Sequence, residues 1–186
     1  MTSLQLDFPE EWAVLPVRAG GDLAVADVVA GLAELGPETQ EATREYLSAL
    51  LPALAGLGVD GFASLVLPDT EANGLVQAFC AVGTETGPAS EERLRSIAEG
   101  GLHPDLERDT TTVRLPLGVA VRSSAVRWAD ELVDADGVAP YAAEVRFTFA
   151  LDGDRVGILH FETLSLVYLE ELERLFDAIA GTARVG

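Results

Sequence analysis

Hydrophobic and polar residues alternate most regularly in the last third of the chain, from Tyr141 to Leu151. Apolar side chains at every second position are typical of a β-strand with one buried face. The pair Asp152-Gly153 favours a tight hairpin turn, so Arg155 to Thr163 is expected to return as the antiparallel partner. From Tyr168 onward apolar residues recur at helical spacing until Gly181, which predicts a closing helix over the sheet. We expect this hairpin to form the centre of the sheet.

The length of the hairpin turn decides which face of the sheet carries His160, because a shift of one residue turns every side chain over. A two-residue turn places His160 on the side of Val145 and Phe147, whereas a turn that includes Asp154 places it opposite Arg146. Packing favours the second register, since it gathers the aromatic side chains of both strands on one face. The other face then carries cross-strand charge pairs formed by Glu144, Arg146, His160 and Glu162.

Earlier segments show the same two periods, in an order that predicts an α+β fold. Apolar or alternating runs predict strands at 4–8, 12–17, 61–67, 75–82, 110–115 and 119–128. Helical spacing predicts one helix from Leu23 to Gly36, a second from Pro37 that is interrupted at Pro52, and a third between Ser90 as N-cap and Gly100. Short links between strands favour antiparallel pairing. We therefore expect one antiparallel sheet of about seven strands flanked by helices, in a single domain spanning residues 1–186.

Composition narrows the classes of partner that the surface could bind. The 186 residues include 31 acidic and 12 basic ones, all of the latter Arg, for a formal net charge of −19. Such a surface repels phosphate, which argues against nucleic acid and anionic membranes as partners. We see no N-terminal signal pattern and no apolar run near the ~20 residues of a spanning helix, so a cytoplasmic protein is expected. The acidity is interpreted as a solvated surface, with an acidic face for a basic partner as the alternative.

Motifs that carry catalytic or metal chemistry are scarce in this sequence. Neither a nucleotide-phosphate loop nor a serine-nucleophile elbow occurs, and the chain contains no lysine. Cys80, the only cysteine, lies in an apolar run and is expected to be a buried structural thiol; catalysis would require the fold to bring it to His160. A zinc site would have to combine His103 or His160 with carboxylates. We expect no cofactor and no metal.

His160 and Glu162 are the pair of residues with the best case for a catalytic role. They lie two residues apart on one predicted strand, hence on one face, and could act as a base and the group that orients it. Cross-strand ion pairing is the interpretation favoured here. Four arginines in or beside strands either neutralise neighbouring carboxylates or, if they share one face, bind an anion; they are Arg114, Arg122, Arg127 and Arg146. The candidate binding residues are Arg114, Arg122, Arg146, His160 and Glu162.

The motif Phe8-Pro9-x-x-Trp12 is followed by a predicted helix pair, a run of antiparallel strands and a closing helix. This layout resembles the PsbP-like α/β/α sandwich superfamily, which includes photosystem II accessory proteins, a Ran-binding nuclear regulator and small bacterial proteins and lipoproteins. The resemblance covers most of the chain and implies a non-enzymatic accessory or binding role. The chain lacks the signal or lipidated cysteine of the exported members, so their location is not carried over. No functional residue transfers with the resemblance.

A cytoplasmic, non-catalytic accessory protein that binds another protein is the function that these observations favour. The alternative is a small-molecule-binding domain or enzyme that uses His160, Glu162 and a nearby Arg. A homodimer is a third hypothesis, and it requires a contiguous apolar patch on the sheet or on the last helix. Trp12 and Trp128 are expected to pack in the core or at a sheet edge, although exposed aromatic side chains would indicate an interface.

Overall fold

The computed structural model describes residues 4–17, 25, 37, 40–41, 44–45, 48, 54, 58–69, 74–100, 108–129, 137, 139–151 and 154–186. Its strands are β1 (Leu4–Gln5), β2 (Trp12–Pro16), β3 (Val59–Asp69), β4 (Gly74–Thr86), β5 (Arg108–Leu115), β6 (Gly118–Trp128), β7 (Tyr141–Ala150), β8 (Arg155–Thr163) and β9 (Arg184–Val185). Its helical segments are α3 (Glu91–Glu99), the short 3-10 turn η2 (Leu166–Tyr168) and α4 (Leu169–Ala180).

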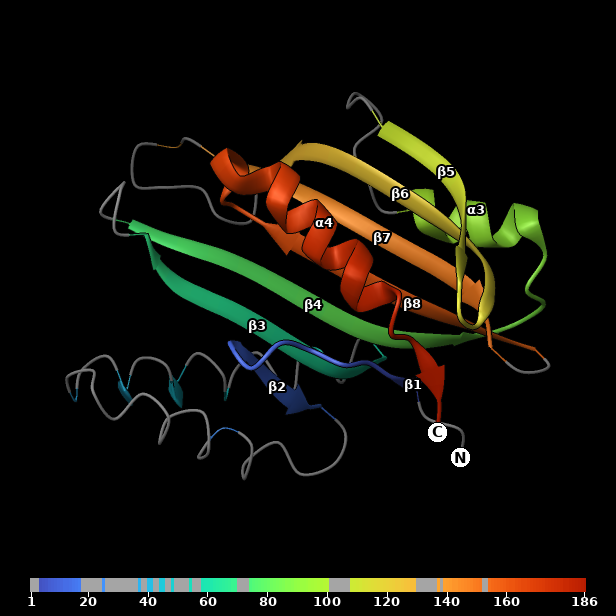
Figure 1. Cartoon of the computed structure of the whole chain (residues 1–186), viewed down its shortest axis with the longest axis horizontal. Helices are drawn as coiled ribbons and strands as arrows, with labels where there is room; N and C mark the ends of the chain where they lie inside the picture. The colour runs from blue at the N-terminus through green and yellow to red at the C-terminus, as the bar shows by residue number, and fades with distance from the viewer. Residues whose placement is uncertain are drawn as a thin grey trace.

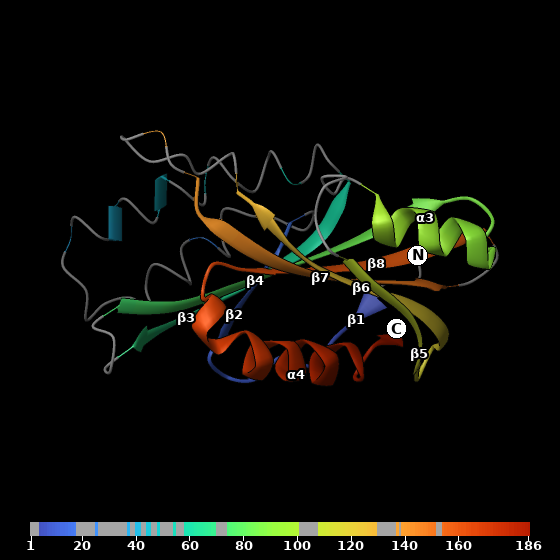
Figure 2. The ribbon, with the colours of Figure 1, turned by 90° about the horizontal axis from the view of Figure 1, so that it is seen from above.

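Seven of these strands form one antiparallel sheet in the order β2-β3-β4-β8-β7-β6-β5 (Figure 1). Helix α4 lies against one face of this sheet and α3 against the other (Figure 2). The predicted α+β fold with an antiparallel sheet of about seven strands is thus confirmed. Among the residues that the structure describes, no helix combines the length and the apolar character needed to cross a membrane.

The β7–β8 hairpin lies at the centre of the sheet and has the register predicted from packing. Arg146 pairs with His160, and Phe147 pairs with Leu159. The Leu151 N–H donates a hydrogen bond of 3.0 Å to the carbonyl oxygen of Arg155, which closes the hairpin beyond the last strand pair. The predicted turn residues 152–153 lie outside the described ranges. In this register the aromatic side chains of β7 and β8 lie on one face of the sheet, and their charged side chains lie on the other.

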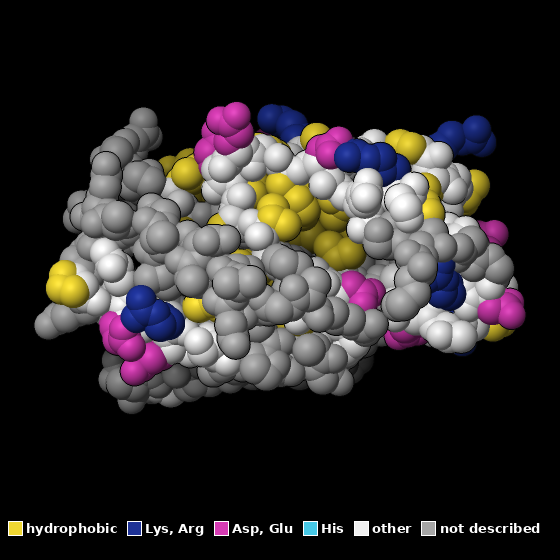
Figure 3. All heavy atoms as spheres, turned by 90° about the horizontal axis from the view of Figure 1, so that it is seen from below, with side chains coloured by type: hydrophobic (Ala, Val, Ile, Leu, Met, Phe, Trp, Pro, Cys, Tyr) yellow, Lys and Arg dark blue, Asp and Glu magenta, His cyan; other side chains and the backbone are white. Residues whose placement is uncertain are grey.

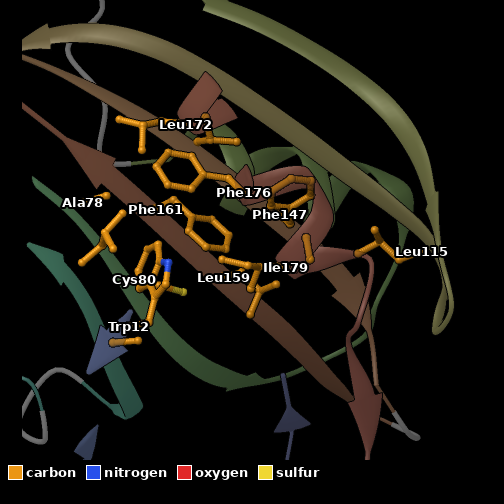
Figure 4. Close-up of a cluster of buried hydrophobic side chains, with 14 of the residues drawn as sticks. Trp12, Ala78, Cys80, Leu115, Phe147, Leu159, Phe161, Leu172, Phe176 and Ile179 are labelled. Atoms are coloured by element: carbon orange, nitrogen blue, oxygen red, sulfur yellow. The ribbon is translucent and has the colours of Figure 1, made fainter. Parts of the chain in front are cut away.

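The face that packs against α4 holds a large hydrophobic core (Figure 4). Phe147 and Phe161 meet edge to face with 6.0 Å between ring centroids, and Phe161 stacks on Phe176 of α4 at 4.7 Å. Full burial of one such side chain contributes about 1.5–3 kcal/mol to stability. The remaining buried side chains that surround these rings include Cys80, Val145, Leu159, Leu172 and Ile179.

The opposite face is covered near β5, β6 and β7 by α3. The helix begins and ends as predicted, with the Ser90 hydroxyl accepting a hydrogen bond from the backbone N–H of Arg93 and with Gly100 as C-cap. The Thr148 hydroxyl in the middle of β7 donates to the carbonyl oxygen of Leu94 at 2.7 Å, which ties the helix to the sheet. A second small apolar cluster fills this contact and comprises Leu94, Ala98, Val121 and Val156.

Two parts of the chain differ from the sequence prediction or lie beyond the structure. The first strand, expected at 4–8, is confined to Leu4–Gln5, and it pairs with the unpredicted strand β9 at the other end of the chain. Strand β9 has only two residues and is too short to show a period, so sequence patterning does not reveal it. The predicted helices between 23 and 58 fall mostly outside the described residues, and so does His103.

Candidate functional site

Five charged or titratable side chains converge on the α3 face of the sheet, where β6, β7 and β8 run side by side. Residues that pair across antiparallel strands share a face, and alternation along each strand separates these side chains from the core aromatics. We call this set the polar cluster; its members are Arg127, Glu144, Arg146, His160 and Glu162.

Glu144 of β7 is the buried centre of the polar cluster, with 4% of its side chain exposed. Its Oε2 accepts a hydrogen bond from Nε2 of His160 at 2.8 Å; because an ionised carboxylate can only accept, Nε2 carries the proton. Oε2 is also 3.6 Å from the guanidinium of Arg146, and Oε1 is 3.4 Å from Nε of Arg127. Burial opposes the charge, but the hydrogen bond and these positive groups outweigh it and hold the pKa of Glu144 below its ordinary value.

Arg127 of β6 joins the two carboxylates of the polar cluster. Glu144 and Glu162 are direct cross-strand neighbours on β7 and β8, an arrangement that is repulsive when nothing lies between the charges. The guanidinium of Arg127 donates to Oε2 of Glu162 at 3.0 Å while its Nε faces Glu144. The cross-strand partner of Arg127 is the small Ala142, which leaves room for the long side chain to reach β8. One arginine thus neutralises a like-charged pair and links three strands.

Arg146 of β7 connects the polar cluster to the C-terminal end of α3. Its guanidinium donates to the carbonyl oxygens of Ile97 and Gly100, which lie at the helix end that carries partial negative charge. The Ile97 carbonyl also accepts the N–H of the C-cap Gly100. Burial lowers the pKa of Arg146, the charge of Glu144 raises it, and Arg108 and Arg127 lower it further. Arg108 donates to the carbonyl oxygen of Glu99 at 2.6 Å, so two arginines cap the same helix end.

Glu144, His160 and Glu162 also offer three potential metal-ligating atoms within 4.8 Å of one another. The carboxylate oxygens of that group are the ones that Arg127 and Arg146 already contact. A divalent cation in this position would face two guanidinium groups at close range in a partly buried environment. The arrangement therefore favours an ion-pair network over a metal centre.

The structure brings together three of the five candidate binding residues, Arg146, His160 and Glu162. Arg122 lies on the opposite face, where its Nε donates to Asp177 of α4 at 2.8 Å. Arg122 is an odd number of residues from Arg127 on the same strand, so their side chains point to opposite sides. The four strand arginines therefore do not share one face, which the anion-binding alternative required, and Arg122 instead neutralises the carboxylates of Glu173 and Asp177. Arg114 is exposed near the end of β5 that lies away from Arg108.

Cys80 and His160 do not meet. Cys80 pairs with Phe161, the neighbour of His160, and the thiol lies in the core beneath α4, whereas His160 points to the α3 face. Cys80 is fully buried, and this burial raises the pKa of its thiol, which disfavours the nucleophilic thiolate. The fold therefore does not form a Cys–His pair from these two residues.

Figure 3 shows the side of the molecule that lies lowest in Figure 1, where β2 forms the edge of the sheet. A hollow on this side contains hydrophobic side chains. On β2 itself Val14 is exposed, and Val66 and Leu67 of the adjacent β3 are exposed as well. Val66 and Leu67 are consecutive on β3 and point to opposite faces of the sheet, so these exposed side chains do not by themselves form the contiguous patch that the homodimer hypothesis requires. The oligomeric state remains a prediction that sizing in solution would test.

The fold and the polar cluster define an α+β protein whose central sheet carries a partly buried ion-pair network. Comparison of the chain with protein-family models and with curated proteins finds no match.

Proposed function

We propose that the chain is a cytoplasmic, non-catalytic accessory protein that binds another protein, built on a PsbP-like α/β/α sandwich. The observation that carries the proposal is that the polar cluster is engaged in internal ion pairs. Its most buried member, Glu144, is contacted by His160, Arg127 and Arg146. Side chains engaged in internal ion pairs stabilise the sheet. We therefore assign partner binding to the surface outside the polar cluster.

The charge of that surface supports a protein partner of opposite sign. The formal net charge is −19, and the first turn of α4 carries the exposed side chains of Glu170 and Glu171. Such a surface attracts basic partners over a distance of about one Debye length, roughly 8–10 Å at physiological ionic strength. Attraction of this kind raises the association rate and weakens as salt is added.

The proposal is tested by retention of a partner on the immobilised full chain and by measurement of its affinity. We expect a protein from the source cells to be retained, and its dissociation constant to increase when the salt concentration is raised. Replacement of Glu170 and Glu171 by Gln is expected to weaken binding without altering the fold. Turnover of a small substrate by the purified chain, lost in His160→Gln, would contradict the proposal.

A second candidate function, a small-molecule-binding domain or enzyme, is supported by the contact between His160 and Glu144. A carboxylate 2.8 Å from an imidazole nitrogen orients the ring and fixes its tautomer, and 29% of the His160 side chain is exposed. Glu162 and Arg146 would then complete the site. A compound that raises the melting temperature of the wild type and not of His160→Gln would support this function, whereas equal responses would exclude a site at His160.

A further inference from the structure

An exposed aromatic pair lies at the ends of β6 and β7. Trp128 and Tyr141 are cross-strand partners whose rings stack with centroids 4.0 Å apart and planes inclined by 28°. They are 43% and 45% exposed, whereas the other tryptophan, Trp12, is buried in the core. Stacked Trp and Tyr rings held on a rigid sheet lose little conformational freedom on binding, and these residue types dominate the energetics of protein interfaces.

This pair lies on the α4 side of the sheet, at the end where α4 begins. Alternation along β6 places Trp128 on the same face as Arg122, which contacts α4. The start of β7 and the N-terminal end of α4 lie at the same end of the molecule in both views (Figures 1 and 2), and β7 contacts η2. Val167 of η2 is exposed there as well. The aromatic pair and Val167 are thus exposed apolar groups at the same end of the molecule.

Acidic side chains lie at the same end of the molecule as this pair. Glu170 and Glu171 occupy the first turn of α4 and are exposed; Glu170 also pairs with Arg174 one turn further on. The sequence between the two aromatic residues contains four more acidic residues and no basic one. The faces of Trp and Tyr rings carry negative electrostatic potential, so the rings and the carboxylates both favour a cation, and a guanidinium also stacks on the rings.

We propose that Trp128 and Tyr141, together with Val167 and the acidic first turn of α4, form a docking surface for an Arg-rich segment of a partner protein. This inference rests on the proposed function and specifies the surface and the partner chemistry. Guanidinium groups of the segment stack on the exposed rings, and its remaining charges lie near Glu170 and Glu171. Stacking on the rings contributes affinity that depends little on salt, and the ionic contacts contribute affinity that decreases as salt is added.

The probe is a fluorescein-labelled peptide of alternating Arg and Gly, titrated with the full chain and followed by fluorescence anisotropy; the corresponding Glu-Gly peptide is the matched control. We expect the Arg peptide to bind and the Glu peptide not to bind. The double variant Trp128→Ala/Tyr141→Ala is expected to weaken binding by about tenfold, from the loss of two cation–π contacts. Val119→Ser removes an exposed apolar side chain near the other end of β6 and is expected to leave the affinity unchanged.

A conservative variant shows whether a loss of binding comes from the missing aromatic face or from a damaged fold. Trp128→Phe retains an aromatic face and is expected to bind within about threefold of the wild type, and emission from the buried Trp12 reports the intact core in every variant. Equal affinity of the wild type and the double variant would overturn the inference, and so would failure of the Arg peptide to bind the wild type. Either result leaves the proposed function standing if a partner is still retained in a salt-dependent manner.

Discussion

Replacement of Glu144 by Gln removes one negative charge from the centre of the polar cluster at nearly constant volume. The amide oxygen can still accept the hydrogen bond from His160, but the amide NH2 group then faces the guanidinium of Arg127, donor against donor. Arg146 loses its carboxylate partner and keeps only the helix-end carbonyl groups. The substitution therefore isolates the ionic contribution of the network from its packing.

The size of the expected loss in unfolding free energy follows from the burial of Glu144. Only 4% of the Glu144 side chain is exposed, and removing one partner of a buried ion pair typically costs about 3–5 kcal/mol. The hydrogen bond retained from His160 and the remaining carboxylate Glu162 place the expected loss near the lower limit, about 3 kcal/mol. For a chain of this size that loss lowers the melting temperature by about 6–12 °C.

The assay is urea unfolding followed by tryptophan fluorescence, with Glu170→Gln as the matched control. Glu170 is 78% exposed in a surface pair with Arg174, so its replacement is expected to change the free energy of unfolding by less than about 0.5 kcal/mol. A loss below about 0.5 kcal/mol for Glu144→Gln would refute the reasoning, because it would show that the network contributes no more than an ordinary surface pair.

The difference in stability between the wild type and Glu144→Gln is expected to depend on pH. The folded pKa of Glu144 lies below the unfolded value of about 4.3. A carboxylate with a lowered pKa stabilises the fold fully above the unfolded pKa and loses that contribution as the pH falls through the folded pKa. The part of the stability difference between wild type and Glu144→Gln that comes from the Glu144 charge is thus expected to narrow as the pH falls below about 4.3.

Three further predictions concern the polar cluster and the hydrophobic core beneath α4. Arg127→Met is expected to cost about 2–4 kcal/mol in urea unfolding because two carboxylates lose their bridge, whereas Arg114→Met, at an exposed position, should stay within about 0.5 kcal/mol; equal costs would contradict the bridging role. Phe161→Ala is expected to cost about 3–5 kcal/mol by leaving a cavity beneath α4, against almost nothing for the exposed Val167→Ala. Cys80 should react with a thiol reagent only at the rate of unfolding, and rapid labelling of the native chain would show that the core opens locally.

Much of the fold follows from periodicity in the sequence. The β7–β8 hairpin and its register were predictable because only one register gathers the aromatic side chains on one face, as the pairing of Phe147 with Leu159 confirms. Helix α3 was predictable from its Ser90 cap and its Gly100 stop. The pairing of β1 with β9 was not, because it joins two-residue strands from opposite ends of the chain and depends on tertiary contacts alone.

The polar cluster was predicted in part. Alternation places Glu144, His160 and Glu162 on one face of the hairpin, and the structure does the same. The bridging role of Arg127 depends on the pairing of β6 with β7, which the sequence of the hairpin does not specify. Counting residues along β6 would have separated Arg122 from Arg127, because an odd spacing on a strand reverses the face.

A double-mutant cycle between Glu144→Gln and Arg127→Met tests most directly whether the polar cluster acts as one structural unit. The two side chains lie 3.4 Å apart and share the ionic environment of Glu162, so their effects should not add. We predict that the double variant is more stable than the sum of the single losses implies, by at least about 1 kcal/mol. Additive losses would contradict the view that these charged groups serve to hold the three strands together.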